Sequence, residues 1–128
     1  MAVELNHTIV LATDPDASAA FLAGVLGLEV QPRWGYFVPV RVANGVTLDY
    51  MGVDEAVAPQ HYAFLVSEEE FDAVHARLLD GDVPIWADPA QTLPGEINHH
   101  DGGRGVYFAD PDGHLMEAIT RPYGAERA

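Results

Sequence analysis

The chain has 128 residues, is 48% hydrophobic and carries a formal net charge of −14 at pH 7. This length and composition are typical of one globular domain, which we place at residues 1–128, and they argue against a disordered chain. The absence of Cys excludes disulfides, a thiol nucleophile and thiolate metal sites, and the absence of Lys excludes Schiff-base chemistry. The negative charge opposes binding to nucleic acid or to anionic membrane surfaces. No apolar run approaches the roughly 18–20 residues of a membrane span, and no signal peptide is evident, so we expect a cytoplasmic protein.

The first half of the chain predicts a strand, a helix and then three short strands. Residues 5–11 are rich in strand formers. Asp14, followed by Pro15, starts a helix that ends at Gly27. The apolar face of this helix is predicted to hold Phe21, Leu22, Val25 and Leu26. Three strand-like segments follow, near residues 28–31, 36–42 and 46–51, and Asn44-Gly45 is a hairpin signal between the last two.

The second half predicts the same order of elements. Residues 61–66 again favour a strand. Ser67 with Glu70 three residues later is a capping box, and the helix that it starts ends at Gly81. Its apolar face is predicted to hold Phe71, Val74 and Leu78. Strand-like segments then return near residues 83–86, 104–109 and 114–120.

Superposition of the halves indicates an internal repeat. His7 aligns with His61 at an offset of 54, and Asp49 aligns with Glu117 at an offset of 68. The difference of 14 residues is assigned to an insertion in the loop 87–103, which is rich in Pro, Gly, Asn and His. We therefore divide the single domain into two modules, at about residues 4–52 and about residues 60–121.

The four aligned residues suggest a metal site. A single His on a strand is usually not a ligand, but Glu117 lies in the apolar run Leu-Met-Glu-Ala-Ile, where an uncompensated carboxylate would be costly to bury. Asp49 in Thr-Leu-Asp-Tyr-Met poses the same problem at the equivalent position of the other half. Two imidazoles with a carboxylate are typical of non-haem Fe(II) sites, and Mn, Ni, Zn and Co also fit this donor set.

Two segments resemble the vicinal oxygen chelate superfamily, which includes glyoxalase I, bleomycin-resistance proteins and extradiol ring-cleaving dioxygenases. They are Ser18-Ala-Ala-Phe-Leu-Ala-Gly-Val-Leu-Gly-Leu-Glu-Val30 and Gly105-Val-Tyr-Phe-Ala-Asp-Pro-Asp-Gly-His-Leu-Met-Glu117. The resemblance spans about residues 4–121. It implies an α+β fold of two βαβββ modules that form a half-open, mixed, mostly antiparallel barrel around a metal ion.

The resemblance also implies site residues. His7, His61 and Glu117 fall at the family's ligand positions, and Asp49 falls at a fourth position where glyoxalase I-like members usually carry Glu. Asp49 would be a fourth ligand if its side chain, one methylene shorter than that of Glu, reaches the metal. Otherwise Asp49 is expected either to act as a base or substrate contact beside the metal, or to be a solvated strand residue.

Which further residues assist catalysis depends on the length of one turn and on the position of one loop, and the sequence leaves both open. Ring-cleaving members carry a Tyr ten residues before the ligand Glu, and Tyr107 has this spacing. A three-residue turn at Pro111–Gly113 would place Tyr107 opposite Glu117, whereas a four-residue turn would place Val106 there. In the loop before this strand, His99 or His100 could act in acid–base chemistry near neutral pH, or both could be exposed loop residues.

Three functions follow from the resemblance. The first is a metal-dependent enzyme, by preference an extradiol-type dioxygenase acting on a small aromatic diol, with Tyr107 and His100 as helpers. No evident match exists for an additional active-site His of some ring-cleaving enzymes. A glyoxalase-like isomerase or lyase, with Glu117 or Asp49 moving a proton, is the second. The third is a bleomycin-resistance-type protein that binds a cationic drug without catalysis. We expect a small-molecule substrate and a homodimer.

Overall fold

A computed structural model describes residues 2–124 of the chain and divides it into two compact units, with the boundary in the sequence between Ala58 and Pro59. Each unit is one open, mixed sheet with one helix, so the α+β class is confirmed. Within residues 2–124, neither helix is long and apolar enough to cross a membrane.

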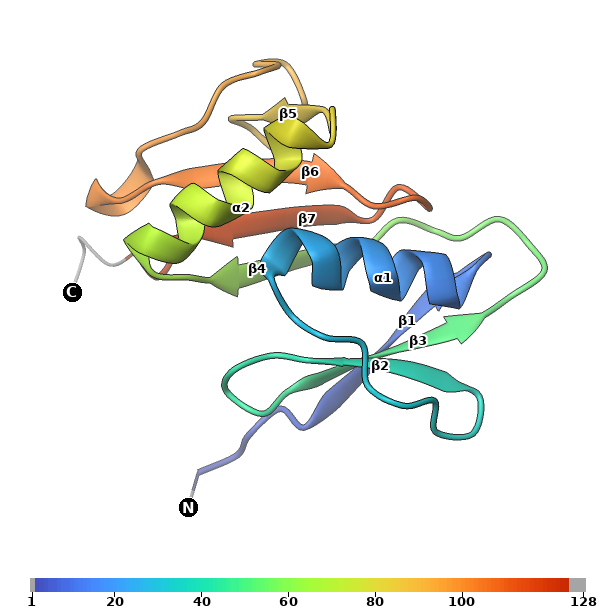
Figure 1. The fold of residues 1–128 in the computed structure, drawn as a ribbon. Coiled ribbons are helices and arrows are strands. Elements are labelled where there is room, and N and C mark those ends of the chain that lie inside the picture. The colour runs from blue at the N-terminus through green and yellow to red at the C-terminus, as the bar shows by residue number, and fades with distance from the viewer. Residues whose placement is uncertain (1, 125–128) are drawn as a thin grey trace. The chain divides into compact units, whose positions relative to one another are not determined.

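The first unit contains β1 (His7–Ala12), α1 (Pro15–Leu26), β2 (Phe37–Arg41) and β3 (Thr47–Gly52). Its sheet has the order β1-β3-β2, in which β1 runs parallel and β2 antiparallel to the central β3. Helix α1 packs along one face of this sheet (Figure 1). Along β1, Val10 and Ala12 are fully buried, whereas His7, Ile9 and Leu11 alternate with them and are exposed. The candidate ligand His7 therefore lies on the sheet face that α1 leaves open.

Helix α1 begins and ends where its caps predict. The Asp14 side chain accepts a hydrogen bond from the Ala17 N–H at 3.1 Å, and Gly27 ends the helix in the left-handed region at φ 72°. The buried face differs slightly from the prediction, because the sheet contacts a stripe of small and aliphatic residues, and Phe21 and Leu26 lie only at its edge. The buried residues are Ser18, Ala19, Leu22, Ala23 and Val25.

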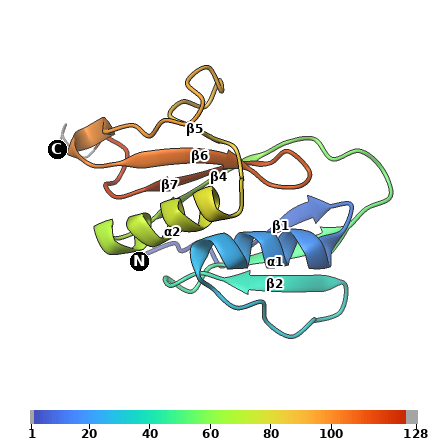
Figure 2. The same cartoon turned by 45° about the horizontal axis from the view of Figure 1, so that its top comes forward.

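The second unit contains β4 (His61–Leu65), α2 (Glu68–Asp80), β5 (Ile85–Trp86), β6 (Gly105–Ala109) and β7 (Leu115–Ile119), with a short 3₁₀ turn at His100–Gly102. The sheet order is β4-β7-β6-β5, with β4 parallel to β7 and the other pairs antiparallel. Figure 2 shows α2 lying across this sheet. The predicted capping box at Ser67 and Glu70 is present, and the predicted apolar face is fully buried: Phe71, Val74 and Leu78.

Strand pairing confirms the internal repeat. In each unit the first strand runs parallel to the last one, and the aligned acidic residues occupy equivalent places: Asp49 is opposite Ile9, and Glu117 is opposite Ala63. The strand predicted near residues 28–31 is reduced to a single bridge between Val30 and Val40. The inserted loop after β5 contains only bridges and the 3₁₀ turn.

Candidate metal and substrate site

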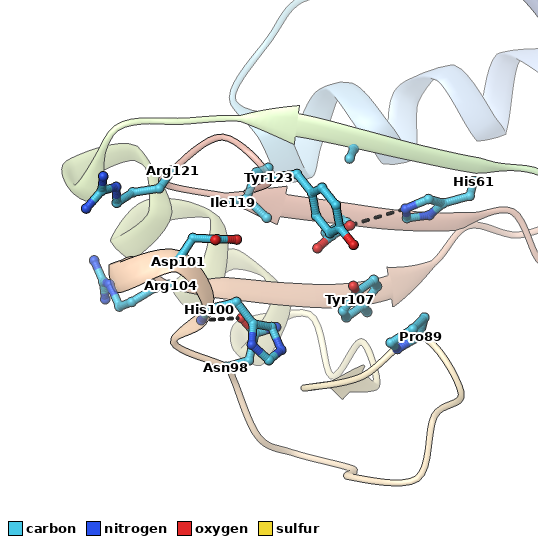
Figure 3. A pocket seen from close by; sticks show the side chains of 12 residues that line it. His61, Pro89, Asn98, His100, Asp101, Arg104, Tyr107, Ile119, Arg121 and Tyr123 are labelled. Atoms are coloured by element: carbon cyan, nitrogen blue, oxygen red, sulfur yellow. Dashed lines mark hydrogen bonds and ion pairs between the residues drawn. The ribbon is translucent and has the colours of Figure 1, made fainter. Parts of the chain in front are cut away.

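His61 and Glu117 face each other across the parallel pair β4 and β7. His61 Nδ1 lies 2.9 Å from the Leu115 carbonyl oxygen, so this ring nitrogen donates its proton there. His61 Nε2 then points at Glu117 Oε1, 3.2 Å away (Figure 3). In a neutral imidazole that donates from Nδ1, Nε2 carries a lone pair, and a carboxylate oxygen carries only lone pairs. Two facing lone pairs require a cation between or beside them, either a proton or a metal ion.

The spacing of this pair fits a metal ion. Two donor atoms that each lie about 2.0–2.2 Å from one ion are roughly 2.8–3.6 Å apart for coordination angles between a right angle and a tetrahedral one. The 3.2 Å between Nε2 and Oε1 falls in this interval. Glu117 is largely shielded, with 14% of its side chain exposed, whereas 48% of the His61 side chain is exposed. The carboxylate is therefore held inside the sheet face, while the imidazole reaches it from the edge strand.

Tyr107 lies opposite Glu117, which resolves the register that the sequence leaves open. Asp110 N–H donates to the His114 carbonyl at 2.9 Å, so the turn between β6 and β7 holds three residues, and Tyr107 pairs with Glu117. Burial raises the pKa of Tyr107, and the hydrogen bond to Glu117 and the charge of that carboxylate raise it further. The phenol therefore keeps its proton beside the carboxylate. The His61 and Tyr107 rings are stacked with 6.0 Å between centroids.

A cavity of about 720 Å³ opens beside these three residues within the second unit. The loop before β6 supplies one wall, and the segment that follows β7 supplies another (Figure 3). The lining residues are His61, Ala63, Pro89, Asn98, His100, Asp101, Arg104, Tyr107, Glu117, Ile119, Arg121 and Tyr123. Four of the six predicted site residues therefore line one cavity: His61, His100, Tyr107 and Glu117. His99 is not among the lining residues.

The wall that carries His100 is fixed by Asn98. Asn98 is buried, with 9% of the residue exposed. Its Nδ2 donates to the Ala87 carbonyl at 2.9 Å, and its Oδ1 accepts the His100 N–H at 3.2 Å. Asp101 follows in the left-handed region at φ 55°, and its carboxylate accepts the Gly124 N–H at 3.1 Å. This hydrogen bond joins the segment that carries Tyr123 to the loop that carries His100.

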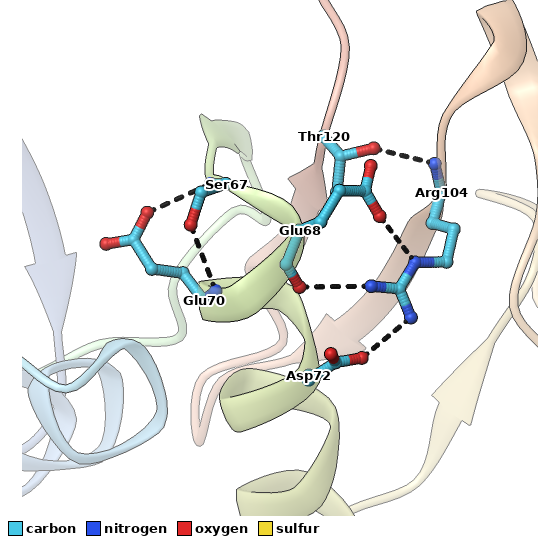
Figure 4. Close-up of polar contacts among 6 residues, drawn as sticks. All are labelled: Ser67, Glu68, Glu70, Asp72, Arg104 and Thr120. Atoms are coloured by element: carbon cyan, nitrogen blue, oxygen red, sulfur yellow. Dashed lines mark hydrogen bonds and ion pairs between the residues drawn. The ribbon is translucent and has the colours of Figure 1, made fainter.

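Arg104 forms part of the cavity wall, but its charge is already paired. Figure 4 shows its guanidinium against the start of α2, where Nε donates to Glu68 Oε1 and Nη1 donates to Asp72 Oδ1, each at 2.8 Å. These hydrogen bonds, first to Asp72 and then to Glu68, raise the pKa of Arg104. The guanidinium also lies 4.5 Å above the centre of the Phe71 ring. Arg104 therefore ties the loop before β6 to α2 and is not a free anion-binding group.

His7 and Asp49 lie in the first unit, on the same face of its sheet. The register pairs His7 with Thr47 and Ile9 with Asp49, so both side chains project on the side opposite α1. They line a separate cavity of about 390 Å³, together with residues that include Trp34, Phe37 and Arg41. His7 Nδ1 lies 2.8 Å from Asn6 Oδ1. Among residues 2–124, no group of three or more His, Asp or Glu side chains gathers closely enough to hold a metal ion.

The sequence analysis missed several wall residues. Asn98 and Asp101, which flank the two loop histidines, were not predicted as site residues, and neither were Arg121 and Tyr123. The one sequence signal for Asn98 is its position at the end of a polar loop, where an amide satisfies backbone groups. Tyr123 carries no such signal, because its place over the cavity depends on the Asp101 contact.

Comparison with known proteins identifies the family. The model of the Glyoxalase/Bleomycin resistance protein/Dioxygenase superfamily matches residues 4–118. The chain belongs to this superfamily. The match covers both units and therefore confirms the resemblance drawn from the two sequence segments.

Individual relatives point to more than one chemistry. The chain is 58% identical to a solved structure of "Oxidase ChaP-H2", with a TM-score of 0.96 over 98% of this chain and 99% of that one. It is 32% identical over 123 residues to "Glutathione transferase FosA" of Serratia marcescens, covering 91% of this chain and 80% of the relative. A mutant FosX of Listeria monocytogenes, solved with Mn(II) and 1S,2S-dihydroxypropylphosphonic acid, has a TM-score of 0.73 at 23% identity over 98% of this chain and 96% of that one, and shows the fold alone.

Proposed function

We propose that this chain is a divalent-metal-dependent oxidative enzyme that acts on a small hydroxylated aromatic compound. The observation that carries the proposal is the facing pair His61 Nε2 and Glu117 Oε1, 3.2 Å apart, with the Tyr107 phenol hydrogen-bonded to the same carboxylate. The similarity to an oxidase at 58% identity over nearly the whole chain supports oxidative chemistry. Fe(II) is the preferred metal, because two His and one carboxylate with open positions are typical of Fe(II) oxygenases.

His61 and Glu117 supply two ligands of the proposed site, and we assign the third to His7. Its equivalence to His61 in the repeat supports this assignment, since each histidine begins the first strand of its unit. Asp49, the equivalent of Glu117, is proposed as a base or substrate contact. Ile9, Leu11 and Leu65 are exposed, apolar and on the same strands as the two histidines, which supports a homodimer whose site combines residues of two chains.

The bound metal would act as a Lewis acid that holds neighbouring substrate oxygens. The residues of the chain would then handle protons. Tyr107 Oη keeps its proton beside Glu117 and can donate it to a substrate oxygen that develops negative charge. His100, on the loop wall of the cavity, can take a proton from a substrate hydroxyl. In the ring-cleaving form of the reaction both atoms of O₂ enter the product and one ring carbon–carbon bond breaks, so no other oxidant or reductant is needed.

Metal content tests this proposal. The chain, purified without a chelator or a metal-affinity tag, is expected to hold about one Fe or Mn per chain and to consume O₂ with a catechol. His61→Ala and Glu117→Ala are expected to lose both the metal and the O₂ consumption. His75→Ala, on α2 away from the cavity lining, is the matched control and should keep them. The proposal fails if the wild-type chain takes up none of Fe(II), Mn(II), Ni(II) or Zn(II).

A group-transfer function is the second candidate, and the similarity to FosA and FosB proteins favours it. A FosB from Lysinibacillus sphaericus, named a metallothiol transferase, is 30% identical over 91% of this chain and 81% of its own length. Against this function, the cavity offers few basic groups for an anionic substrate. Among residues 2–124, only Arg104 and Arg121 are basic lining residues with a permanent charge, and Arg104 is paired with Glu68 and Asp72. Conversion of a thiol with an epoxide by the metal-loaded chain, without O₂ consumption on any catechol, would favour the transferase.

A further inference from the structure

The turn between β6 and β7 carries a buried histidine that the proposed chemistry does not use. His114 is 1% exposed and follows the tight turn Asp110-Pro-Asp-Gly. Asp110 Oδ1 accepts the N–H groups of Asp112 at 3.0 Å and of His114 at 2.8 Å. Gly113 closes the turn at φ 87°, in the left-handed region that favours glycine. These contacts fix the backbone of His114 before its side chain is considered.

The His114 side chain reaches the residue that precedes the metal ligand on β4. Its Nδ1 accepts the Gln60 N–H at 2.9 Å. A backbone N–H only donates, so this nitrogen carries no proton and the ring acts here as an acceptor. The residue after His114 makes a second contact with Gln60, because the Leu115 N–H donates to the Gln60 carbonyl at 2.8 Å. Both peptide groups that flank Gln60 are therefore bound by the adjacent residues His114 and Leu115.

Strand β7, which begins at Leu115, also orients the ring of His61. The Leu115 carbonyl accepts the proton of His61 Nδ1 at 2.9 Å, and His61 Nε2 faces Glu117 Oε1 at 3.2 Å. His114, Leu115 and Glu117 thus each contact the Gln60–His61 pair. Tyr62, on the other side of His61 in the chain, packs edge-on against the His114 ring, with 5.9 Å between ring centroids and 80° between the planes.

We infer that His114 is a positioning residue, which holds the backbone at Gln60 and thereby aims His61 Nε2 at Glu117. The inference rests on the proposed metal function only for its effect on metal binding, since the contacts that carry it join residues of the chain itself. Without an acceptor at His114 Nδ1, the Gln60 N–H loses its partner in the protein, and the start of β4 can move away from β7.

The experiment compares His114→Asn with His114→Leu. Asn places its Oδ1 close to the position of His Nδ1 and keeps an acceptor, whereas Leu keeps bulk without one. In metal-free protein, imidazole NMR is expected to show a slowly exchanging His61 Nδ1 proton in the wild type and in His114→Asn, and to lose it in His114→Leu. Titration with Mn(II) is expected to show roughly 10- to 100-fold weaker binding for His114→Leu, the range found for residues that orient metal ligands.

Two controls separate positioning from simple loss of stability. Ser67→Ala removes the cap of α2 and lowers stability, yet should leave the His61 signal and the Mn(II) affinity unchanged. His75→Leu makes the same His-to-Leu change on α2, and it is the control for that change in both the His61 signal and the Mn(II) affinity. The inference is overturned if His114→Leu keeps both the His61 signal and the affinity, or if Ser67→Ala alters them equally.

Wild-type measurements decide the question even if His114→Leu does not fold. A protected Gln60 amide with NMR scalar coupling to His114 Nδ1 supports the inference, and rapid exchange of that amide or a protonated Nδ1 overturns it. If the wild-type chain binds none of Fe(II), Mn(II), Ni(II) or Zn(II), the proposed metal function fails, whereas the NMR comparison still decides the role of His114.

Discussion

Tyr107 keeps its phenol proton because burial and the Glu117 carboxylate both oppose the phenolate. In the unfolded chain a tyrosine loses its proton near about pH 10. Above that pH the unfolded chain has released the proton while the folded chain still holds it, so rising pH favours unfolding. The stabilisation from protonated Tyr107 is therefore complete below about pH 10 and is lost as the pH rises toward its folded pKa.

Replacement of Tyr107 by Phe should make the free energy of unfolding less sensitive to alkali. Denaturant unfolding between about pH 9 and pH 11 is expected to show a smaller loss of stability for Tyr107→Phe than for the wild type, because Phe has no proton to release. Tyr62→Phe should act in the same direction, since burial and then the Asp110 charge raise the pKa of Tyr62. Equal alkaline slopes for Tyr107→Phe and the wild type would contradict this account.

Single residues differ in how far the sequence reveals them. The pairing of His61 with Glu117 was expected from the repeat, because equivalent positions of duplicated strands share a face. Whether Tyr107 joins them depended on one residue of turn length, which the sequence Asp-Pro-Asp-Gly does not specify. The structure decides it through the Asp110–His114 hydrogen bond. The role of His114 was not foreseen, because a ring that accepts from a distant backbone N–H leaves no local pattern.

At the scale of elements, the loop before β6 is held by close packing that leaves no room for a side chain at Gly105. A Cβ there would lie 2.8 Å from Asn98 Oδ1, and two backbone hydrogen bonds, of 2.9 and 3.0 Å, join Gly105 to Asn98. Because Asn98 is buried and holds both Ala87 and His100, it has little freedom to give way.

Gly105→Ala is therefore expected to destabilise the protein by about 1–3 kcal/mol through overpacking and to displace the loop that carries His100. Thermal or denaturant unfolding measures the first effect, and the His100 amide resonance measures the second. Gly24→Ala is the matched control, since no atom lies within 4 Å of the added methyl, and this helical site should gain up to about 1 kcal/mol. Unchanged stability and an unchanged His100 resonance in Gly105→Ala would argue against this close approach.

The helices were easier to predict than the short strands. Caps at Asp14 and Ser67 are local signals, and both helices begin there. The strand predicted near residues 83–86 begins only at Ile85, because the Val83 N–H donates to the Leu78 carbonyl at the end of α2, at 2.9 Å, and Pro84 has no N–H to donate. Whether a helix end or a strand ladder binds a backbone N–H is decided by tertiary context, which a sequence pattern does not contain.

At the scale of the whole molecule, the proposed ligands divide between the two units. His7 belongs to the first unit, and His61 and Glu117 belong to the second. The repeat predicted which residues of the two units are equivalent. The sequence pattern does not show whether the residues that form one site come from the same chain or from two chains. A homodimer with two shared sites is the arrangement that we propose.

A mixture of two inactive variants tests this arrangement. If each site takes His7 from one chain and His61 from the other, a heterodimer of His7→Ala and His61→Ala chains has one intact site and one doubly damaged site. Random reassociation of equal amounts should then restore about a quarter of the wild-type metal content and activity. No recovery, after mass measurements have shown that heterodimers form, would mean that all three ligands come from one chain.

Both proposed histidines lie on the strand that ends the sheet of their unit on one side, β1 in one case and β4 in the other. Each of these strands pairs only with a partner about 40 to 54 residues later in the chain, whereas β6 and β7 are joined by a three-residue turn. In kinetic terms, the histidine-bearing strands complete the contacts of highest sequence separation, after the local hairpins have had time to form. During synthesis, β1 must wait until β3 has been made, and β4 must wait until nearly the whole chain is available. The ligand geometry is thus among the last features of each unit to be established as the chain folds.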